Sequence, residues 1–180
     1  MKVVAIVGMT GSGKSEVTAV FRENGFASVR FGDVTDEEVR KRGLELNEAN
    51  ERAVREELRL ENGMDIYALL NIPRIDAALK SSDVVVDGLY SWEEFTCLRK
   101  RYGADLVLVA VCASPATRYS RLADRDIRPL TAEEAHERDF AEIENMNKGG
   151  PIAIADFTIV NESSFEDMKA QAEKIIGSLK

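Results

Sequence analysis

A glycine-rich segment near the start of the chain has the residue types and spacing of a phosphate-binding loop, or P-loop. It fits the pattern G-x-x-x-x-G-K-[ST], and its members are Gly8, Met9, Thr10, Gly11, Ser12, Gly13, Lys14 and Ser15. Glycines let such a loop wrap tightly, so that several backbone N–H groups converge on one anion. We expect Lys14 to reach the β- and γ-phosphates of ATP and the hydroxyl of Ser15 to hold Mg²⁺. Because an apolar run precedes the motif and a helix-like segment follows it, a nucleotide site is favoured over a coincidental glycine-rich turn.

Two carboxylates follow strand-like runs and are candidates for chemistry next to the phosphates. Asp87 ends a run of three valines, an arrangement in which a carboxylate holds Mg²⁺ directly or through water. Its alternative role is that of a turn aspartate before glycine. Asp33 is predicted to orient an acceptor or to take the proton of an attacking hydroxyl, and its alternative role is to cap the next helix. Tyr90 either lines an acceptor pocket or is buried in the core.

Arginines form two groups, and guanidinium forks suit phosphate oxygens. The candidates for acceptor binding in the first group are Arg40, Arg52 and Arg55. The candidates in the second group, which follows the fourth strand-like run, are Arg121, Arg125 and Arg128. The second group is predicted to neutralise the transferring phosphoryl group from a short lid over residues 121–131. For each arginine, the alternative is an ion pair with a glutamate on a helix surface.

Composition indicates one globular domain over residues 1–180, with 44% hydrophobic and 31% charged residues. The formal net charge of −8 argues against a nucleic-acid partner, because it leaves no broad basic face. The first strand-like run begins at Val3, and no apolar run has the length of a membrane span. We therefore expect a cytoplasmic protein, a monomer or homodimer, with a small-molecule substrate and no membrane partner.

Strand-like and helix-like segments alternate, which predicts an α/β fold with a mainly parallel sheet. The strand-like runs are residues 3–7, 27–31, 83–87, 106–112 and 157–160. Between the second and third of them, residues 35–79 are helical in pattern. Helix starts are predicted at Thr35, Ser91, Ser114, Thr131 and Ser163. The last helix is predicted to pack on the sheet through an apolar stripe made of Phe165, Met168, Ala172, Ile175, Ile176 and Leu179. Residues 148–151 are expected to form a loop without decisive chemistry.

The chain resembles the nucleoside and nucleotide kinase branch of P-loop proteins. The resemblance rests on the Gly8–Ser15 motif, Gly-Asp after the second strand, Asp-Gly after the third and the arginines after the fourth. It is similar to adenylate kinases, dephospho-CoA kinases and small archaeal proteins related to adenylate kinase. The resemblance implies a three-layer fold with five parallel strands, an acceptor-binding insertion over residues 35–79, and a short lid. It also implies that Asn161 lies beside the adenine of ATP and that Asp33 acts on the acceptor.

Two departures from the adenylate kinase pattern bear on the acceptor. Adenylate kinases have arginines that bind the acceptor phosphate where this chain has Asp36 and the segment Leu89-Tyr90-Ser91. We therefore predict an Mg·ATP-dependent phosphotransferase acting on a small nucleotide-like acceptor, in the manner of a dephospho-CoA kinase. One alternative is a nucleoside monophosphate kinase. The other is a regulatory switch that binds nucleotide without transfer; the chain has no N-K-x-D motif for reading guanine, which favours ATP over GTP.

Overall fold

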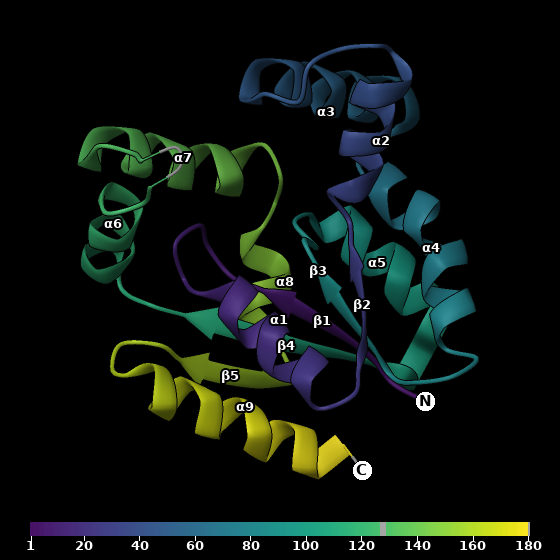
Figure 1. Ribbon diagram of the computed structural model, residues 1–180, viewed down its shortest axis with the longest axis vertical. Helices are drawn as coiled ribbons and strands as arrows, with labels where there is room; N and C mark the ends of the chain where they lie inside the picture. The colour runs from purple at the N-terminus through teal and green to yellow at the C-terminus, as the bar shows by residue number, and fades with distance from the viewer. Residues whose placement is uncertain (127–128, 180) are drawn as a thin grey trace.

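A parallel sheet with helices on both faces forms the centre of the computed structural model, which describes residues 1–126 and 129–179 (Figure 1). The strands are β1 (Val3–Val7), β2 (Ala27–Arg30), β3 (Val84–Asp87), β4 (Leu106–Cys112) and β5 (Phe157–Val160). They pair in the order β2-β3-β1-β4-β5, and these pairings are parallel. The predicted α/β fold with a five-stranded parallel sheet is confirmed.

The helices make up the two outer layers and a set of elements beyond the sheet. They are α1 (Lys14–Glu23), α2 (Asp33–Lys41), α3 (Glu48–Asn62), α4 (Ile66–Ala78), α5 (Trp92–Tyr102), the 3₁₀ turn η1 (Gly103–Asp105), α6 (Pro115–Ala123), α7 (Ala132–Glu144), α8 (Gly149–Ala153) and α9 (Phe165–Leu179). Among the described residues, no helix is long and apolar enough to span a bilayer.

The central strand β1 is buried on both faces, as its unbroken apolar sequence predicts. Val4 and Ile6 belong to the apolar cluster that α1 and α9 complete on one face. Ala5 and Val7 belong to the cluster that α4 and α5 complete on the other. The two clusters hold β1 in the middle of three layers, and the loop that follows β1 therefore starts from a rigid position.

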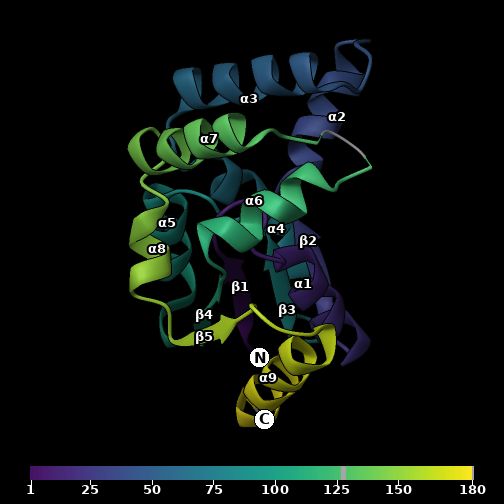
Figure 2. The same cartoon turned by 90° about the vertical axis from the view of Figure 1, so that its left-hand side faces the viewer.

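Four helices lie beyond the carboxyl ends of the strands, where α/β sheets bind ligands. Figures 1 and 2 show α2 and α3 above the β2 side and α6 and α7 above the β4 side, with α3 and α7 next to each other. The segment 35–79 is helical, as predicted, but its helices α3 and α4 occupy different positions relative to the sheet. Tyr67, Ala68 and Ile75 of α4 pack into the core, whereas α3 stands away from the sheet and buries Val54.

The predicted helix start at Thr35 is wrong. Helix α2 begins two residues earlier, at Asp33, with Gly32 at the N-cap position. Thr35 lies inside the helix, and its buried hydroxyl shares a 2.7 Å hydrogen bond with the hydroxyl of Tyr67 in α4. A tertiary partner for the hydroxyl, which the local sequence does not reveal, replaces the local backbone partner that a cap would use.

Three other predicted caps are confirmed, and one is displaced. The side chains of Ser91, Ser114 and Thr131 accept N-capping hydrogen bonds, and the first and last belong to complete capping boxes. At the start of α9, Ser164 rather than Ser163 accepts the bond, from the backbone N–H of Asp167. The pattern allowed both registers, because serines and acidic residues repeat in the segment.

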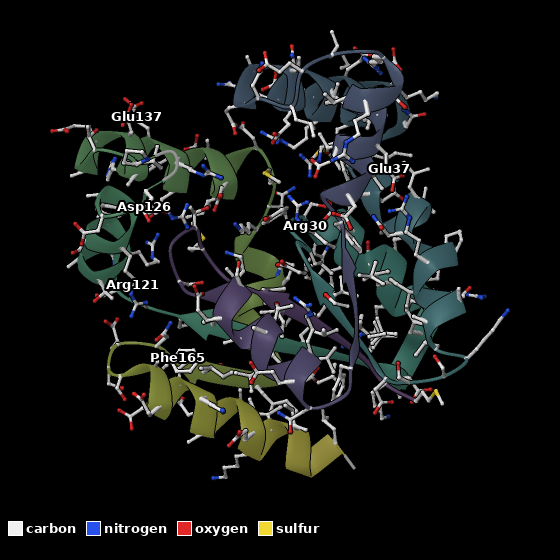
Figure 3. All side chains as sticks on the ribbon, viewed as in Figure 1. Arg30, Glu37, Arg121, Asp126, Glu137 and Phe165 are labelled. Carbon is white, nitrogen blue, oxygen red and sulfur yellow. The ribbon has the colours of Figure 1, made fainter. Side chains whose placement is uncertain are left out.

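Two further predictions are wrong and matter for the site. Residues 149–153 form the short helix α8 instead of a loop, and Lys148 before it is 1% exposed. The stripe of α9 packs on the sheet as predicted through Met168, Ala172, Ile175 and Ile176, but Phe165 does not: it is 53% exposed and lines the cleft above the P-loop (Figure 3). Both residues take positions set by other elements of the fold and not by the periodicity of their own segment.

Candidate active site

The loop between β1 and α1 has a backbone that requires glycine. Gly8 has φ +150°, and Gly13 has φ +96°, in the left-handed region. A Cβ atom on Gly8 would lie 2.4 Å from the carbonyl oxygen of Val111, and one on Gly13 would lie 2.2 Å from Nδ2 of Asn161. The motif glycines therefore serve the close approach of neighbouring elements as well as the turn itself.

Side chains from distant parts of the chain donate hydrogen bonds to the carbonyl groups of the loop. Arg118 in α6 donates from Nη1 to the carbonyl of Thr10 at 3.1 Å, and Asp139 of α7 holds this buried guanidinium by two bonds of 2.7 and 2.6 Å. Asn161, at the end of β5, donates from Nδ2 to the carbonyl of Ser12 at 2.9 Å. Because buried carbonyls need donors, these residues hold the loop in its turned conformation.

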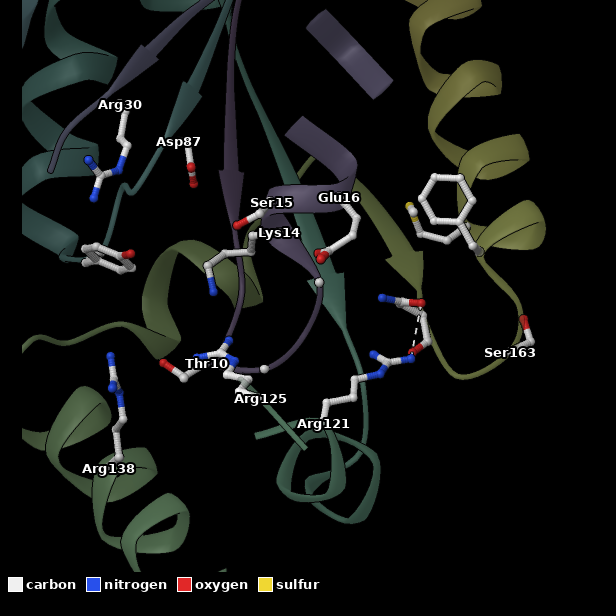
Figure 4. Close-up of a pocket in the computed structure, with 16 residues that line it drawn as sticks. Thr10, Lys14, Ser15, Glu16, Arg30, Asp87, Arg121, Arg125, Arg138 and Ser163 are labelled. Carbon is white, nitrogen blue, oxygen red and sulfur yellow. Dashed lines mark hydrogen bonds between the residues drawn. The ribbon is translucent and has the colours of Figure 1, made fainter. Parts of the chain in front are cut away.

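The resemblance to nucleotide kinases implied that Asn161 lies beside the adenine. Asn161 lines the cleft, and its side-chain amide is already engaged with the loop. It also receives Arg121, which donates to the backbone carbonyl of Asn161 at 3.0 Å (Figure 4). Asn161 therefore stabilises the conformation of the loop through its bond to Ser12.

Lys14, the motif lysine, points along the inner side of the loop. Its Nζ donates to the carbonyl of Met9 at 3.0 Å. Burial, reinforced by the positive charge of Lys148, lowers the pKa of Lys14 to about 7, against the opposing effects of Glu142 and Asp87. A cation this poorly solvated gains strongly from a bound phosphate.

A cleft of about 660 Å³ opens above the loop. Cations reach it from several elements (Figure 4): Lys14, Arg30, Arg121, Arg125 and Arg138. Figure 3 shows Arg30 and Arg121 approaching the loop from opposite sides. On a protein of net charge −8, this concentration of positive charge marks an anion site.

The cations of the cleft differ in their partners. Arg30 is bound by Asp33 and Asp36 at 2.9 Å each, and Arg138 donates to Glu142 at 3.3 Å. Within the part of the chain that the structure describes, Lys14, Arg121 and Arg125 form no ion pair with a carboxylate. These three are therefore the cations with charge left to neutralise a bound polyphosphate. Arg128, the third predicted lid arginine, lies outside the described residues.

A second cleft, of about 460 Å³, adjoins the first on the side of α2 and α3. The two clefts share the residues Arg30, Asp87, Tyr90, Arg125 and Arg138. The shared set forms a junction, so that groups bound in the two clefts meet there. Of the alternatives for Tyr90, the structure supports a side chain that lines the site.

The two predicted carboxylates differ in position. Asp87 ends β3 beside Ile6 of β1 and lines both clefts, and burial raises its pKa although Lys14 and Arg30 oppose the shift. Asp33 is the first residue of α2, its side chain is 48% exposed, and it binds Arg30. Asp33 lines neither cleft itself, but it binds Arg30, which lines both.

The oxygen ligands expected for Mg²⁺ fit this cleft. Ser15 lies in the first turn of α1, and both Ser15 and Asp87 line the cleft that Lys14 enters (Figure 4). Glu16, which the sequence analysis did not single out, adds a further carboxylate. Magnesium in nucleotide sites is commonly held by one or two protein oxygens together with phosphate oxygens and water.

The three arginines proposed for acceptor binding are dispersed. Arg55 lines the second cleft and is paired with Glu48 and Glu51 of the same helix. Arg52 is paired with Glu56 and lines a third cleft, of about 820 Å³, between α3 and α7. Arg40 is exposed on α2 and is not among the described residues that line these clefts. Only Arg55 of the three is near the junction.

Residues of α7 contribute to the site although sequence reasoning did not identify them. Ala135, Asp139 and Glu142 are its buried positions, and two of these three are acidic. The spacing i, i+4, i+7 marks them as one helix face, which is the available sequence signal. Because two of the three residues are acidic, the sequence made this face look solvent-exposed. In the structure this acidic face is buried, and the aromatic Phe140 is the exposed residue.

Comparison with known proteins agrees with the fold and places the chain in a family. Residues 4–158 match the family described as AAA domain. The UPF0200 protein TK1334 of Thermococcus kodakarensis is 39% identical over 98% of this chain and 97% of its own length. The UPF0200 protein MJ1399 of Methanocaldococcus jannaschii is 37% identical over 98% of this chain and 89% of its own. The chain belongs to the AAA domain family and to the UPF0200 family.

Solved structures with similar folds include kinases. TT1252 from Thermus thermophilus superposes with a TM-score of 0.67 at 20% identity, covering 99% of this chain and 98% of the other. Shikimate kinase from Bacteroides thetaiotaomicron gives 0.63 at 13% identity, with 99% and 98% covered. A gluconokinase from Sinorhizobium meliloti gives 0.58 at 15% identity, with 99% and 95% covered. At these identities the likeness establishes the P-loop kinase fold.

Gly13→Ala is expected to weaken nucleotide binding about tenfold or more, because its Cβ would displace Asn161 and distort the N–H groups of the loop. Gly25→Ala is the matched control: its φ of +92° imposes similar backbone strain, but a Cβ there meets no atom within 4 Å. Calorimetric titration with ADP and thermal unfolding measure both effects. Equal losses of affinity in the two variants would contradict a specific role for the Gly13–Asn161 contact.

Nucleotide binding is expected to take up a proton. The pKa of Lys14 is about 7 in the free protein, and bound phosphate raises it toward the ordinary lysine value because it favours the charged form. Uptake should therefore be about 0.9 proton near pH 8 and about 0.1 near pH 6, and affinity should fall as pH rises above 7. Titration of Mg·ADP in buffers of different ionisation enthalpy measures the uptake. Lys14→Arg, which stays charged, should abolish the difference; undiminished uptake in that variant would assign the proton elsewhere.

Proposed function

Starting from its membership of the UPF0200 family and its P-loop kinase fold, we propose that this protein transfers the γ-phosphoryl group of Mg·ATP to a small nucleotide-like acceptor. The observation that carries the proposal is the junction between the two clefts. A phosphate cleft with three cations that lack an ion-pair partner in the described part of the chain meets a second cleft at Asp87 and Tyr90. A switch that only binds nucleotide has no use for a second cleft opening at the reacting end of the phosphates.

The residues of the loop take the following roles in this proposal. The backbone of Gly8–Ser15 cradles the phosphates, and Lys14 stabilises the charge on the β- and γ-phosphates. Ser15 and Asp87 would hold Mg²⁺, which when bound neutralises charge on the phosphate oxygens. ATP and Mg²⁺ are thus the expected substrate and cofactor.

The transfer step needs positive charge and a place for one proton. An acceptor hydroxyl oxygen forms a bond to the γ-phosphorus, the bond from that phosphorus to the bridging oxygen of ADP breaks, and the hydroxyl proton passes to a carboxylate. Asp87 is the carboxylate at the junction. It would hold Mg²⁺ through water, which leaves the carboxylate able to accept a proton, and we assign the hydroxyl proton to it. Asp33 acts on the acceptor side through Arg30, which it orients. Arg121 and Arg125 neutralise the group in transit, together with Arg128 of the proposed lid over residues 121–131.

The charges of the second cleft favour an acceptor that presents a hydroxyl, as in a dephospho-CoA kinase. Arg30, Arg55 and Arg138 there are each paired with carboxylates. The fourth arginine of this cleft, Arg125, is shared with the phosphate cleft, and in this proposal its charge serves the transferring group. A phosphate dianion would have to break those pairs, whereas a neutral hydroxyl would not. The second candidate is a nucleoside monophosphate kinase, which is supported by the position of Arg55 in the acceptor cleft.

Asp87→Asn is expected to lower the rate of transfer about a hundredfold, because the amide neither accepts the proton nor binds Mg²⁺ as a carboxylate does. Asp33→Asn should lower it about tenfold or less, since Asp36 continues to hold Arg30. Steady-state kinetics with both variants measure the difference. A larger loss for Asp33→Asn would make Asp33 the proton acceptor.

The proposed function is tested by ADP release from Mg·ATP with AMP, CMP, UMP, GMP or dephospho-CoA as acceptor. Stimulation by dephospho-CoA, absent in Lys14→Ala, is the expected result, since that variant lacks the charge on which transfer depends. Stimulation by a nucleoside monophosphate alone would instead establish the second candidate. Tight Mg·ATP binding with no stimulation by any of the five would contradict the proposal in favour of a switch.

A further inference from the structure

A buried ion pair lies behind the P-loop, and the proposed function does not use it. Lys148 is 1% exposed and Glu142 is 7% exposed, and Nζ of Lys148 lies 2.6 Å from Oε2 of Glu142. Burying two charges is expensive, and a well-packed apolar pair would stabilise a fold as well or better. The placement of this pair therefore calls for a reason beyond stability.

Glu142 is bound directly to the loop. Its carboxylate accepts hydrogen bonds from the hydroxyl of Thr10 and, at 3.4 Å, from the backbone N–H of Thr10. Arg138, one helical turn earlier in α7, donates to the same carboxylate at 3.3 Å. Both carboxylate oxygens thus have donors, and the charge of Lys148 and these bonds hold the pKa of Glu142 at about 2 in spite of its burial.

Thr10 belongs to the end of the loop where the transferred phosphate is expected. Lys14 binds the carbonyl of Met9, the residue before Thr10, and the motif lysine contacts the β- and γ-phosphates. The following residues lead to the helix α1, and their N–H groups are expected to face the α- and β-phosphates. A change at Thr10 should therefore weaken binding of the γ-phosphate more than binding of the rest of the nucleotide.

Lys148 also contacts the junction between the two clefts. Its Nζ lies 4.6 Å from the ring centroid of Tyr90, a cation–π contact, and Tyr90 lines both clefts. The backbone N–H of Lys148 donates to the carbonyl of Glu142 at 3.3 Å, which fixes α8 to the end of α7. The pair thus connects the rim of the phosphate loop with the wall of the acceptor cleft.

We propose that Lys148 and Glu142 are positioning residues for phosphoryl transfer: Glu142 fixes Thr10, and Lys148 fixes both Glu142 and Tyr90. The expected effect on the transfer rate rests on the proposed function. The expected effect on the preference for ATP over ADP is independent of it. The pair acts by orientation: among the described residues Lys148 lines none of the three clefts, and Glu142, which lines the second and the third, has its carboxylate engaged by Thr10, Arg138 and Lys148. Removing it should affect ATP more than ADP, because the two nucleotides differ by the γ-phosphate.

The test compares the single variants Lys148→Met and Glu142→Gln with the double variant. Each single variant leaves one buried group without its partner and should lower the melting temperature by roughly 5 °C or more. The double variant should regain most of that loss, because no unpaired charge remains buried: Arg138, which also loses its partner Glu142, has a half-exposed side chain. Its ADP affinity should stay within about twofold of wild type, while the preference for ATP over ADP and the transfer rate each fall about fivefold or more.

A matched control and a second variant keep the test decisive. Arg101→Met with Asp76→Asn removes an ion pair of 2.6 Å that lies at the surface on α5 and α4, and it should leave nucleotide binding unchanged. Thr10→Val removes the hydroxyl that binds Glu142 and keeps the side-chain shape, so it should lower the preference for ATP even if the double variant fails to fold.

A stable double variant with unchanged preference for ATP over ADP and an unchanged transfer rate would overturn the inference and leave the pair a purely structural one. Parallel loss of ADP and ATP affinity would also overturn it, since the whole loop would then depend on the pair. If the wild type shows no transfer to any acceptor, the proposed function fails, whereas the ratio of ADP to ATP affinities still decides the role of the pair.

Discussion

A loop that turns its N–H groups toward an anion must turn carbonyl groups away from it, and each buried carbonyl needs a donor. In this protein Arg118 supplies the donor for Thr10 and Asn161 the donor for Ser12. The helix α6 and the end of β5 deliver these side chains to a loop that follows β1. The anion site therefore depends on the complete sheet and its crossovers, and not on the motif alone.

The same constraint orders the charges around the loop. Cations that support the backbone, such as Arg118, are buried against carboxylates, which fixes their position. Of the cations that line the phosphate cleft, Lys14, Arg121 and Arg125 have no ion-pair partner among the described residues and are available to a bound anion. An acidic protein can in this way present a strongly basic cleft, and the paired arginines of the second cleft give that region a different chemical preference.

Sequence predicted the parts of the structure that local patterns encode. Buried parallel strands have continuous apolar runs, as in 84–86, and the capping boxes at Ser91 and Thr131 use residues three positions apart. The P-loop was predictable because its glycines and lysine are adjacent in the chain. The roles of Lys148 and Thr35 were not predictable from local patterns. Their partners, Glu142 and Tyr67, approach them only in the folded chain. In addition, the segment in which a lysine precedes Gly-Gly-Pro has the composition of a surface loop.

The measurement that tests the account most directly is the destination of the γ-phosphoryl group. ATP labelled in that group is incubated with Mg²⁺, the protein and the acceptor that most stimulates ADP release, and the products are separated. Transfer at the junction of the two clefts should place the label on an organic acceptor, as a phosphate ester, and this product should be lost in Lys14→Ala. Label recovered only as inorganic phosphate would contradict it and would identify the protein as a nucleotide hydrolase or switch.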